Sequence, residues 1–212
     1  MEAYEVVRVF VNKAVVPTGP RRRGNPGYGS LRAVRLLVVD STPLVDLYDM
    51  EAEWGFTGRG PFRGFKLHTA VNQLGLPLRD VVTAGNRYNS PLLPSLLEDL
   101  EAEYVLADAG YDSAADRKAV RGMGAEPVIA INPRRGGKRR LKRRGLLRKR
   151  YVVEQFNGLV KSHVLRGCWV KPRGIAKKAS MVTAGLISLN TTAIQALLQG
   201  EPSLKTVSRY WV

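Results

Sequence analysis

Residues 34–40 read VRLLVVD, and two similar runs follow, GFKLHTAVN at 64–72 and LPLRDVVTAGN at 76–86. Each run is short, rich in aliphatic residues and bounded by turn-forming residues, which is typical of β-strands. Gly75 lies in the short connection between the last two runs, where it favours a turn. The three runs therefore predict three neighbouring strands paired as an antiparallel meander.

The next segment, residues 89–103 (NSPLLPSLLEDLEAE), predicts a helix. Asn89 or Ser90 can cap its N-terminus, because their side-chain oxygens accept hydrogen bonds from backbone N–H groups. Pro91 then falls at the first helical position, which proline tolerates best. The meander is therefore expected to lead into a helix that covers the sheet.

Two more strands are predicted at residues 104–108 (YVLAD) and 126–132 (EPVIAIN). The segment between them predicts a helix that begins at about Ser113, with Asp112 as its cap. Strands that are joined through a helix run parallel. These two strands are therefore expected to add a parallel part to the antiparallel meander.

Helices at residues 147–165 and 175–199 complete the expected elements. Their order is three antiparallel strands, helix, strand, helix, strand and helices. This is the order of an α/β fold of the ribonuclease H type, with a mixed five-stranded sheet flanked by helices. In that fold the first and fourth strands lie side by side at the centre of the sheet.

The composition favours a folded protein that binds polyanions. The 212 residues are 44% hydrophobic, enough for a sizeable core, and carry a net charge of +16. This charge makes nucleic acid the expected partner. A membrane helix is not expected, because no apolar run approaches the roughly 18 residues that such a helix needs. The single cysteine and the absence of a secretory pattern at the N-terminus predict a cytoplasmic protein.

The positive charge is concentrated in residues 134–150, which hold 11 Lys or Arg and no acid. Such a stretch favours phosphate binding over a merely solvated loop. The predicted organisation is an N-terminal arm at 1–33, one domain at 34–200 that contains this basic loop, and a tail at 201–212. The residues expected to contact phosphates within the loop are Arg139, Arg140, Lys142, Arg143 and Arg144.

Two aspartates end predicted strands that should be neighbours. Asp40 ends the apolar core of the first strand and Asp108 ends the fourth. In a ribonuclease H-like sheet their carboxylates would face each other, and their repulsion would have to be offset by cations. The alternative is that each is an ordinary turn or cap residue.

A third acid, Glu154, lies on the helix expected to pack beside the sheet. At about 100° per residue, Arg150 and Lys161 are offset from Glu154 by about 40° and 20°, so that the three share one helix face. A carboxylate between two cations suits a metal ligand flanked by phosphate contacts. An exposed Arg–Glu pair of little energetic value remains the alternative.

Three blocks of this sequence resemble the DDE transposases of bacterial and archaeal insertion sequences, in particular the group with a Tyr-Arg-Glu-Lys signature. The blocks are VVDST at 38–42, the segment from GFKLHTAVN through GNRYNSPLL to VLADAGYDS, and Arg150-x3-Glu154-x6-Lys161. The resemblance implies a catalytic core that cleaves DNA and transfers strands at transposon ends. It also implies two Mg²⁺ or Mn²⁺ ions held by Asp40, Asp108 and Glu154, with phosphate contacts from Arg150 and Lys161.

The resemblance further implies that DNA ends and target are the partners, with a dimer during synapsis and association with the nucleoid. The chain departs from the family pattern at Leu147, where the signature has Tyr, and at Asn89, where an acid is frequent. Only 39 residues precede Asp40, so we expect a separately encoded N-terminal DNA-binding region. The alternatives are a truncated, catalytically inactive DNA-binding remnant and, from charge alone, an RNA-binding protein of ribosomal type.

The remaining polar residues have less specific expectations. His68 lies within a strand, where it is either packed, exposed or a neighbour of the metal. Four further acids are expected to be turn, cap and surface groups. They are Asp46, Asp49, Asp112 and Asp116.

Overall fold

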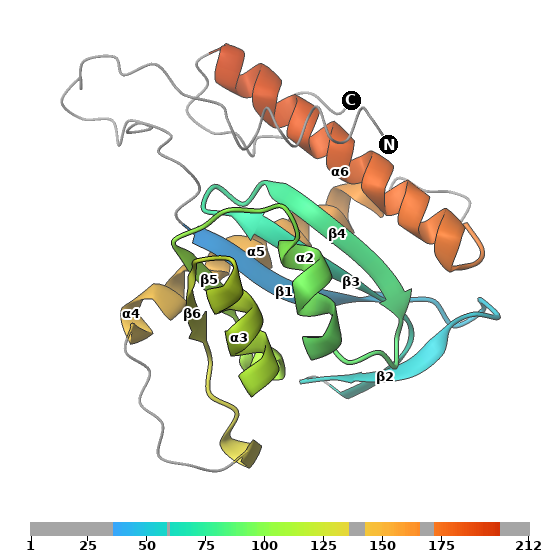
Figure 1. Ribbon diagram of the computed structural model, residues 1–212. Helices are drawn as coiled ribbons and strands as arrows, with labels where there is room; N and C mark the ends of the chain where they lie inside the picture. Colours follow the sequence, from blue (N-terminus) through green and yellow to red (C-terminus); the bar gives the residue numbers. More distant parts are fainter. Residues whose placement is uncertain (1–35, 59, 136–142, 166–171, 200–212) are drawn as a thin grey trace.

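The computed structural model describes residues 36–58, 60–135, 143–165 and 172–199. They form a single mixed sheet with helices on both faces (Figure 1). The predicted arm at 1–33, the tail at 201–212 and three of the predicted phosphate contacts, Arg139, Arg140 and Lys142, lie outside the described residues. In the part of the chain that is described, no helix is long and apolar enough to cross a membrane.

The predicted antiparallel meander is confirmed. Strand β1 (Leu36–Val45) pairs with β3 (Gly60–Asn72), and β3 pairs with β4 (Pro77–Ala84). The turn at Gly75 has φ +77°, a left-handed conformation that glycine adopts without strain. β1 lies between β3 and β5 in the sheet, and its first four residues are buried.

The sheet has six strands, so the expected count of five was wrong. The additional strand, β2 (Glu53–Thr57), pairs with the first residues of β3, which begins at Gly60 instead of the expected residue 64. Its sequence EWGFT buries only Gly55, so it carries no apolar run that would reveal a strand. β2 forms as an edge strand through backbone pairing in a hairpin, and Figure 1 shows it at one end of the sheet.

The parallel part of the sheet is also confirmed. β5 (Tyr104–Ala107) pairs in parallel with β1 on one side and with β6 (Glu126–Ile129) on the other. The strand order is β2-β3-β1-β5-β6, and β4 pairs with β3 beside β2. The first and fourth predicted strands are therefore neighbours, as the ribonuclease H-like order requires.

Helices form a layer on each face of the sheet. On one face lie α2 (Leu93–Leu97) and α3 (Ala114–Gly122), which pack against a core that includes Leu37 and Val39. The other face carries α5 (Tyr151–Leu159), which packs against Val38 and Leu106. The remaining short helices are η1 (Ser90–Leu92), η2 (Ala109–Tyr111), η3 (Pro133–Arg135), α4 (Arg144–Leu147) and η4 (Arg148–Arg150).

The long C-terminal helix α6 (Ile175–Leu198) agrees with the expected 175–199 and runs beside β4 (Figure 1). Asn190 Nδ2 donates to Pro77 O over 2.9 Å, and Thr183 Oγ1 donates to Asp80 Oδ2 over 3.0 Å. The helix expected at 147–165 is divided instead into η4, α5 and a π-helical turn, η5 (Val160–Val164).

Two details of the helix starts differ from expectation. Asn89 makes no capping hydrogen bond, and the helix expected over 89–103 ends at Leu97. Ser113 caps α3, since its Oγ accepts from the N–H of Asp116 over 2.9 Å. Asp112 is not the cap because it is buried and accepts from the Arg117 guanidinium over 2.7 Å and from the Asn132 N–H over 2.8 Å.

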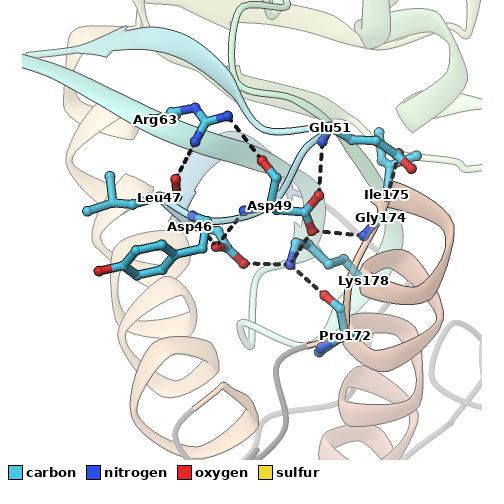
Figure 2. Close-up of polar contacts among 10 residues, drawn as sticks. Asp46, Leu47, Asp49, Glu51, Arg63, Pro172, Gly174, Ile175 and Lys178 are labelled. Atoms are coloured by element: carbon cyan, nitrogen blue, oxygen red, sulfur yellow. Dashed lines mark hydrogen bonds and ion pairs between the residues drawn. The ribbon is translucent and has the colours of Figure 1, made fainter.

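The four acids expected at turns and on the surface are all buried, so their surface placement was wrong. Asp46 and Asp49 do form turn hydrogen bonds, but both also make ion pairs with Lys178 of α6, over 2.8 and 3.1 Å (Figure 2). Asp116 accepts from the Ser90 hydroxyl over 2.5 Å. Burial is tolerated because each of these carboxylates has charged or hydrogen-bonding partners.

Candidate active site

Asp40 and Asp108 lie at the same level on neighbouring central strands. Val39 of β1 is paired in parallel with Ala107 of β5, so each aspartate follows a paired residue. Asp108 directly follows β5 as expected, but Asp40 lies inside β1 and not at its end, because β1 continues to Val45 through its pairing with β3. Because side chains alternate along a strand, both aspartates belong to the sheet face of Leu106, which α5 covers. The sheet therefore brings together the two acids that were expected to meet.

The electrostatics of Asp40 are those of a crowded carboxylate. Burial raises its pKa from the usual 3.8 to about 6, and the charge of Asp108 contributes to that rise. The Ser41 N–H and the Arg150 guanidinium act in the opposite direction, while Glu154 adds a smaller repulsion. Nearby positive charge would therefore be strongly favoured at this position.

Helix α5 supplies a contact to Asp40 that the sequence interpretation missed. Asn157 Nδ2 donates a hydrogen bond to Asp40 Oδ2 over 3.2 Å. Asn157 lies seven residues after Arg150, an offset of about 20° on an ideal helix, and this spacing was the available signal. The backbone of α5 is fixed by three buried side chains, Val152, Val153 and Phe156.

Two buried polar groups border the aspartate pair. The Tyr111 side chain is fully buried, and its pKa is raised well above its usual range by burial and by the charges of Asp40 and Asp108. Its hydroxyl, like the buried Nε of Arg150, has no hydrogen-bond partner among the described residues. Asp108 itself accepts from the Gly110 N–H over 2.9 Å, so it also caps η2, as the alternative interpretation expected.

The chemistry of this donor set fits a hard divalent cation. Carboxylate oxygens are the ligands that Mg²⁺ prefers, and the raised pKa of Asp40 reflects in part a repulsion that a cation would relieve. The fit rests on the aspartate pair, because Glu154 has an exposed side chain on α5. Within the described ranges, no three Asp, Glu, His or Cys side chains form a group able to hold a metal ion.

The expected cations are placed less uniformly. Arg150 is partly buried, and its charge lowers the pKa of Asp40. Lys161 is exposed on the π-helical turn η5, where ideal α-helical offsets do not apply. Arg143 lies near the start of β5, over the Tyr104 ring and 2.8 Å from Glu126, at the opposite end of the strand from Asp108. The side chain of Arg144 lies outside the described part.

His68 does not contribute to this site. It is paired with Ser41, the residue after Asp40, and therefore belongs to the opposite face of the sheet. Its Nε2 lies 3.0 Å from Thr83 Oγ1, and burial lowers its pKa to about 4, so that the ring is neutral at pH 7. Of the alternatives for His68, the packed residue is the one observed.

Asp40→Asn is expected to stabilise the metal-free fold by about 1–3 kcal/mol at pH 7.5. The pKa of Asp40 is about 6 in the folded protein and near 3.8 when unfolded, so the folded state binds the extra proton. Wild-type stability should therefore fall as the pH rises from about 4 to 6, and Asn removes that loss. Urea unfolding in EDTA tests this, and an equal variant-to-wild-type difference at pH 4 and pH 7.5 would contradict it.

Comparison with known proteins agrees with this geometry. A family model described as the transposase DDE domain matches residues 33–191 of the chain. A transposase assigned to insertion sequence element IS6501 of Brucella ovis is 34% identical over 100 residues, which cover 46% of this chain and 76% of that protein. A transposase assigned to element IS402 of Burkholderia cepacia is 32% identical over 120 residues, covering 48% of this chain and 54% of that protein.

Solved structures support the fold. A piggyBac transposase in a synaptic complex with hairpin DNA superposes with a TM-score of 0.54 at 11% identity, covering 83% of this chain and 51% of that one. The chain thus spans about half the length of that structure and of the Burkholderia relative. The narrower Tyr-Arg-Glu-Lys group stays a prediction from the residues. The match of the DDE domain over residues 33–191, more than half of the chain, shows that this protein belongs to the DDE transposases of insertion sequences.

Proposed function

We propose that this transposase core cleaves DNA phosphodiester bonds and transfers the freed strands at transposon ends. Asp40, Asp108 and Glu154 are the proposed ligands of two divalent ions, Mg²⁺ or Mn²⁺. The observation that carries the proposal is the pairing of β1 with β5, which places Asp40 and Asp108 at the same level, with the pKa of Asp40 raised to about 6 by burial and repulsion. When bound, the ions would supply the positive charge that activates an attacking oxygen and stabilises a leaving one.

The residues around Asp40 would orient the metal ligands and bind the DNA phosphate. Asn157 and the Ser41 N–H hold the Asp40 carboxylate in one orientation, which suits a ligand that must not rotate away. Glu154 has an exposed side chain on α5, and its charge contributes to the raised pKa of Asp40. Arg150 places a cation beside the aspartates, where it would neutralise and orient a DNA phosphate.

DNA is the proposed partner of the basic surface. The piggyBac neighbour holds hairpin DNA, and the chain carries a net charge of +16, to which residues 134–150 contribute 11 cations. Lys161 is exposed on the same helical segment as Arg150, and it would contact the DNA backbone further from the cleaved phosphodiester bond. Each phosphate contact releases counterions, so binding should weaken steeply with salt.

Replacing five of the 11 cations of the basic loop with Gln is expected to weaken DNA binding and flatten its salt dependence. The five are Arg139, Arg140, Lys142, Arg143 and Arg144. The slope of log K against log[salt] should become less negative by about 0.9 for each phosphate that is no longer neutralised. Fluorescence anisotropy with a labelled duplex measures this slope. Lys118→Gln with Arg121→Gln, on α3, is the control for charge removed elsewhere. An equal effect per charge in that control would remove the loop from the interface.

The surrounding organisation is proposed on the sequence alone. Residues 34–200 would form the catalytic domain, with an arm at 1–33 and a tail at 201–212. Synapsis would bring two copies together. Such a protein would act in the cytoplasm, at the nucleoid.

The direct test of activity is nicking of supercoiled plasmid by the full chain, with Mg²⁺, Mn²⁺ or EDTA. We expect conversion to open circles with either metal and none with EDTA. DNA binding without nicking in either metal would count against strand cleavage and favour an inactive remnant. Strong binding to RNA, unaffected by duplex DNA as competitor, would favour the ribosomal-type alternative.

A further inference from the structure

Large apolar side chains gather on the surface at one end of the sheet. Eight large hydrophobic residues of the described chain are exposed, and six of them lie within residues 45–56. We call this group the β1–β2 surface, and its members are Val45, Leu47, Tyr48, Met50, Trp54 and Phe56. Single exposed apolar residues are ordinary, but a cluster of this kind marks an interaction site.

Arg63 connects the two parts of this group, the turn after β1 and strand β2. Trp54 and Phe56 flank Gly55 on β2 and therefore point to the same side of the sheet. Trp54 is paired with Arg63 of β3, whose guanidinium donates to the carbonyl of Leu47 and, over 3.2 Å, to that of Asp49. Arg63 thus ties the turn after β1 to the exposed face of β2.

The turn that carries Leu47, Tyr48 and Met50 is fixed by hydrogen bonds and ion pairs of Asp46 and Asp49 (Figure 2). Asp46 Oδ1 accepts from the N–H groups of Tyr48 and Asp49, over 3.1 and 3.2 Å, and Asp49 Oδ1 accepts from Glu51 over 3.0 Å. Both carboxylates also bind Lys178 of α6. The two aspartates therefore face inward while Leu47, Tyr48 and Met50 face solvent, with exposed fractions of 52%, 87% and 93%.

A backbone fixed in this way loses little conformational entropy when the surface docks. Its size is also appropriate. With about 200 Å² for a complete aromatic side chain, the exposed fractions of Tyr48, Trp54 and Phe56 amount to roughly 450 Å². This exceeds half of the roughly 800 Å² that each partner buries in a stable protein complex.

The charge of the segment identifies the kind of partner. Residues 43–58 contain four acids and no Lys or Arg, whereas the rest of the chain has 34 Lys and Arg against 14 Asp and Glu, a net charge of +20. Two of the four acids, Glu51 and Glu53, are exposed. Surfaces on which nucleic-acid bases stack combine aromatic residues with basic ones, and residues 43–58 contain no basic residue. The neighbouring Arg63 donates its guanidinium hydrogen bonds to the carbonyls of Leu47 and Asp49. An apolar surface with an acidic rim is instead complementary to a cationic protein surface.

We propose that the β1–β2 surface docks onto a second copy of this chain, against a cationic face of the partner. A two-fold axis allows the contact to be made twice, because each copy offers both the acidic apolar surface and the basic one. β2 forms one edge of the described sheet, which leaves this end of the molecule accessible to the second copy. The proposal concerns assembly and does not depend on the metal chemistry proposed above.

Sedimentation velocity of the full chain without DNA tests the proposal. We expect concentration-dependent dimers that weaken at high salt, and Trp54→Ser with Phe56→Ser should raise the dimer dissociation constant at least tenfold. Met50→Ser, on the turn and not on the strand, should raise it several-fold and guards against misfolding of β2. Tyr88→Ser, which changes an exposed aromatic residue outside the surface, should leave the dimer unchanged.

Three outcomes would overturn the proposal. The first is a wild-type chain that stays monomeric across the micromolar range. The second is unaltered dimerisation in both the Trp54/Phe56 and Met50 variants. The third is a loss of DNA affinity in these variants with unchanged self-association, which would make the surface a nucleic-acid platform. Because none of these readouts needs cleavage, failure here is distinguishable from failure of the proposed activity.

Discussion

Asp108→Asn is expected to reduce metal-dependent plasmid nicking by about 10³-fold or more. The variant keeps the size and the capping contact to Gly110 but removes one of the two carboxylate charges that meet at the centre of the sheet. Divalent ions contribute several kcal/mol to phosphodiester cleavage, and about 4 kcal/mol corresponds to a factor of 10³. Initial nicking rates in Mn²⁺ measure the effect.

The control for this prediction is Glu101→Gln, which removes an exposed acid from the connection before β5. Its nicking rate should equal that of the wild type, and both variants should keep their DNA affinity. Nicking at the wild-type rate by Asp108→Asn would remove this residue from the proposed site. Equal reductions in both variants would indicate a general effect of charge on DNA binding.

Lys178→Met is expected to destabilise the fold by about 3–5 kcal/mol, the largest effect on stability that we predict. Lys178 Nζ lies 2.8 Å from Asp46 and 3.1 Å from Asp49, and it also donates to the Pro172 carbonyl. Burial raises the pKa of both aspartates, but the hydrogen bonds from Lys178 and from backbone N–H groups outweigh it, so that both pKa values lie below the usual 3.8. Without Lys178, two buried carboxylates would be left without its compensating charge.

Urea unfolding at pH 7 measures this destabilisation. The neighbouring Lys177→Met is the matched control, because Lys177 is exposed, and it should change stability by less than about 0.5 kcal/mol. Neutralising the whole cluster with Asp46→Asn and Asp49→Asn in the Lys178→Met background should recover part of the stability. A Lys178→Met protein as stable as Lys177→Met would show that the cluster does not hold the turn.

The sequence predicted the elements whose apolar runs are long enough to be recognised. β1, β3, β4 and α6 were placed within a few residues of their observed positions, because each buries a periodic or continuous apolar stretch. β2 was missed since its stability comes from hairpin pairing and not from buried side chains. The order of the elements also predicted that the first and fourth strands are neighbours, and this placed Asp40 beside Asp108.

The contacts that the sequence did not reveal join residues far apart in the chain. Asp46 was expected to be a turn, cap or surface group, and its local sequence could not reveal its partner, Lys178, which lies 132 residues away. Asn157 contacts Asp40 across 117 residues, and its helical spacing from Arg150, the available signal, does not identify Asp40 as its partner. The change from α5 to the π-helical η5 was likewise not visible, and it alters the direction in which Lys161 projects.

The central claim, that the aspartate pair forms a divalent-ion site, is tested most directly by Mn²⁺ binding without DNA. Titration calorimetry or Mn²⁺ electron paramagnetic resonance of the wild type should detect binding. Asp40→Asn and Asp108→Asn should each weaken it at least tenfold, and Glu154→Gln should weaken it less, because Glu154 is exposed. Unchanged Mn²⁺ affinity in both aspartate variants would contradict the claim and leave the pair without its proposed function.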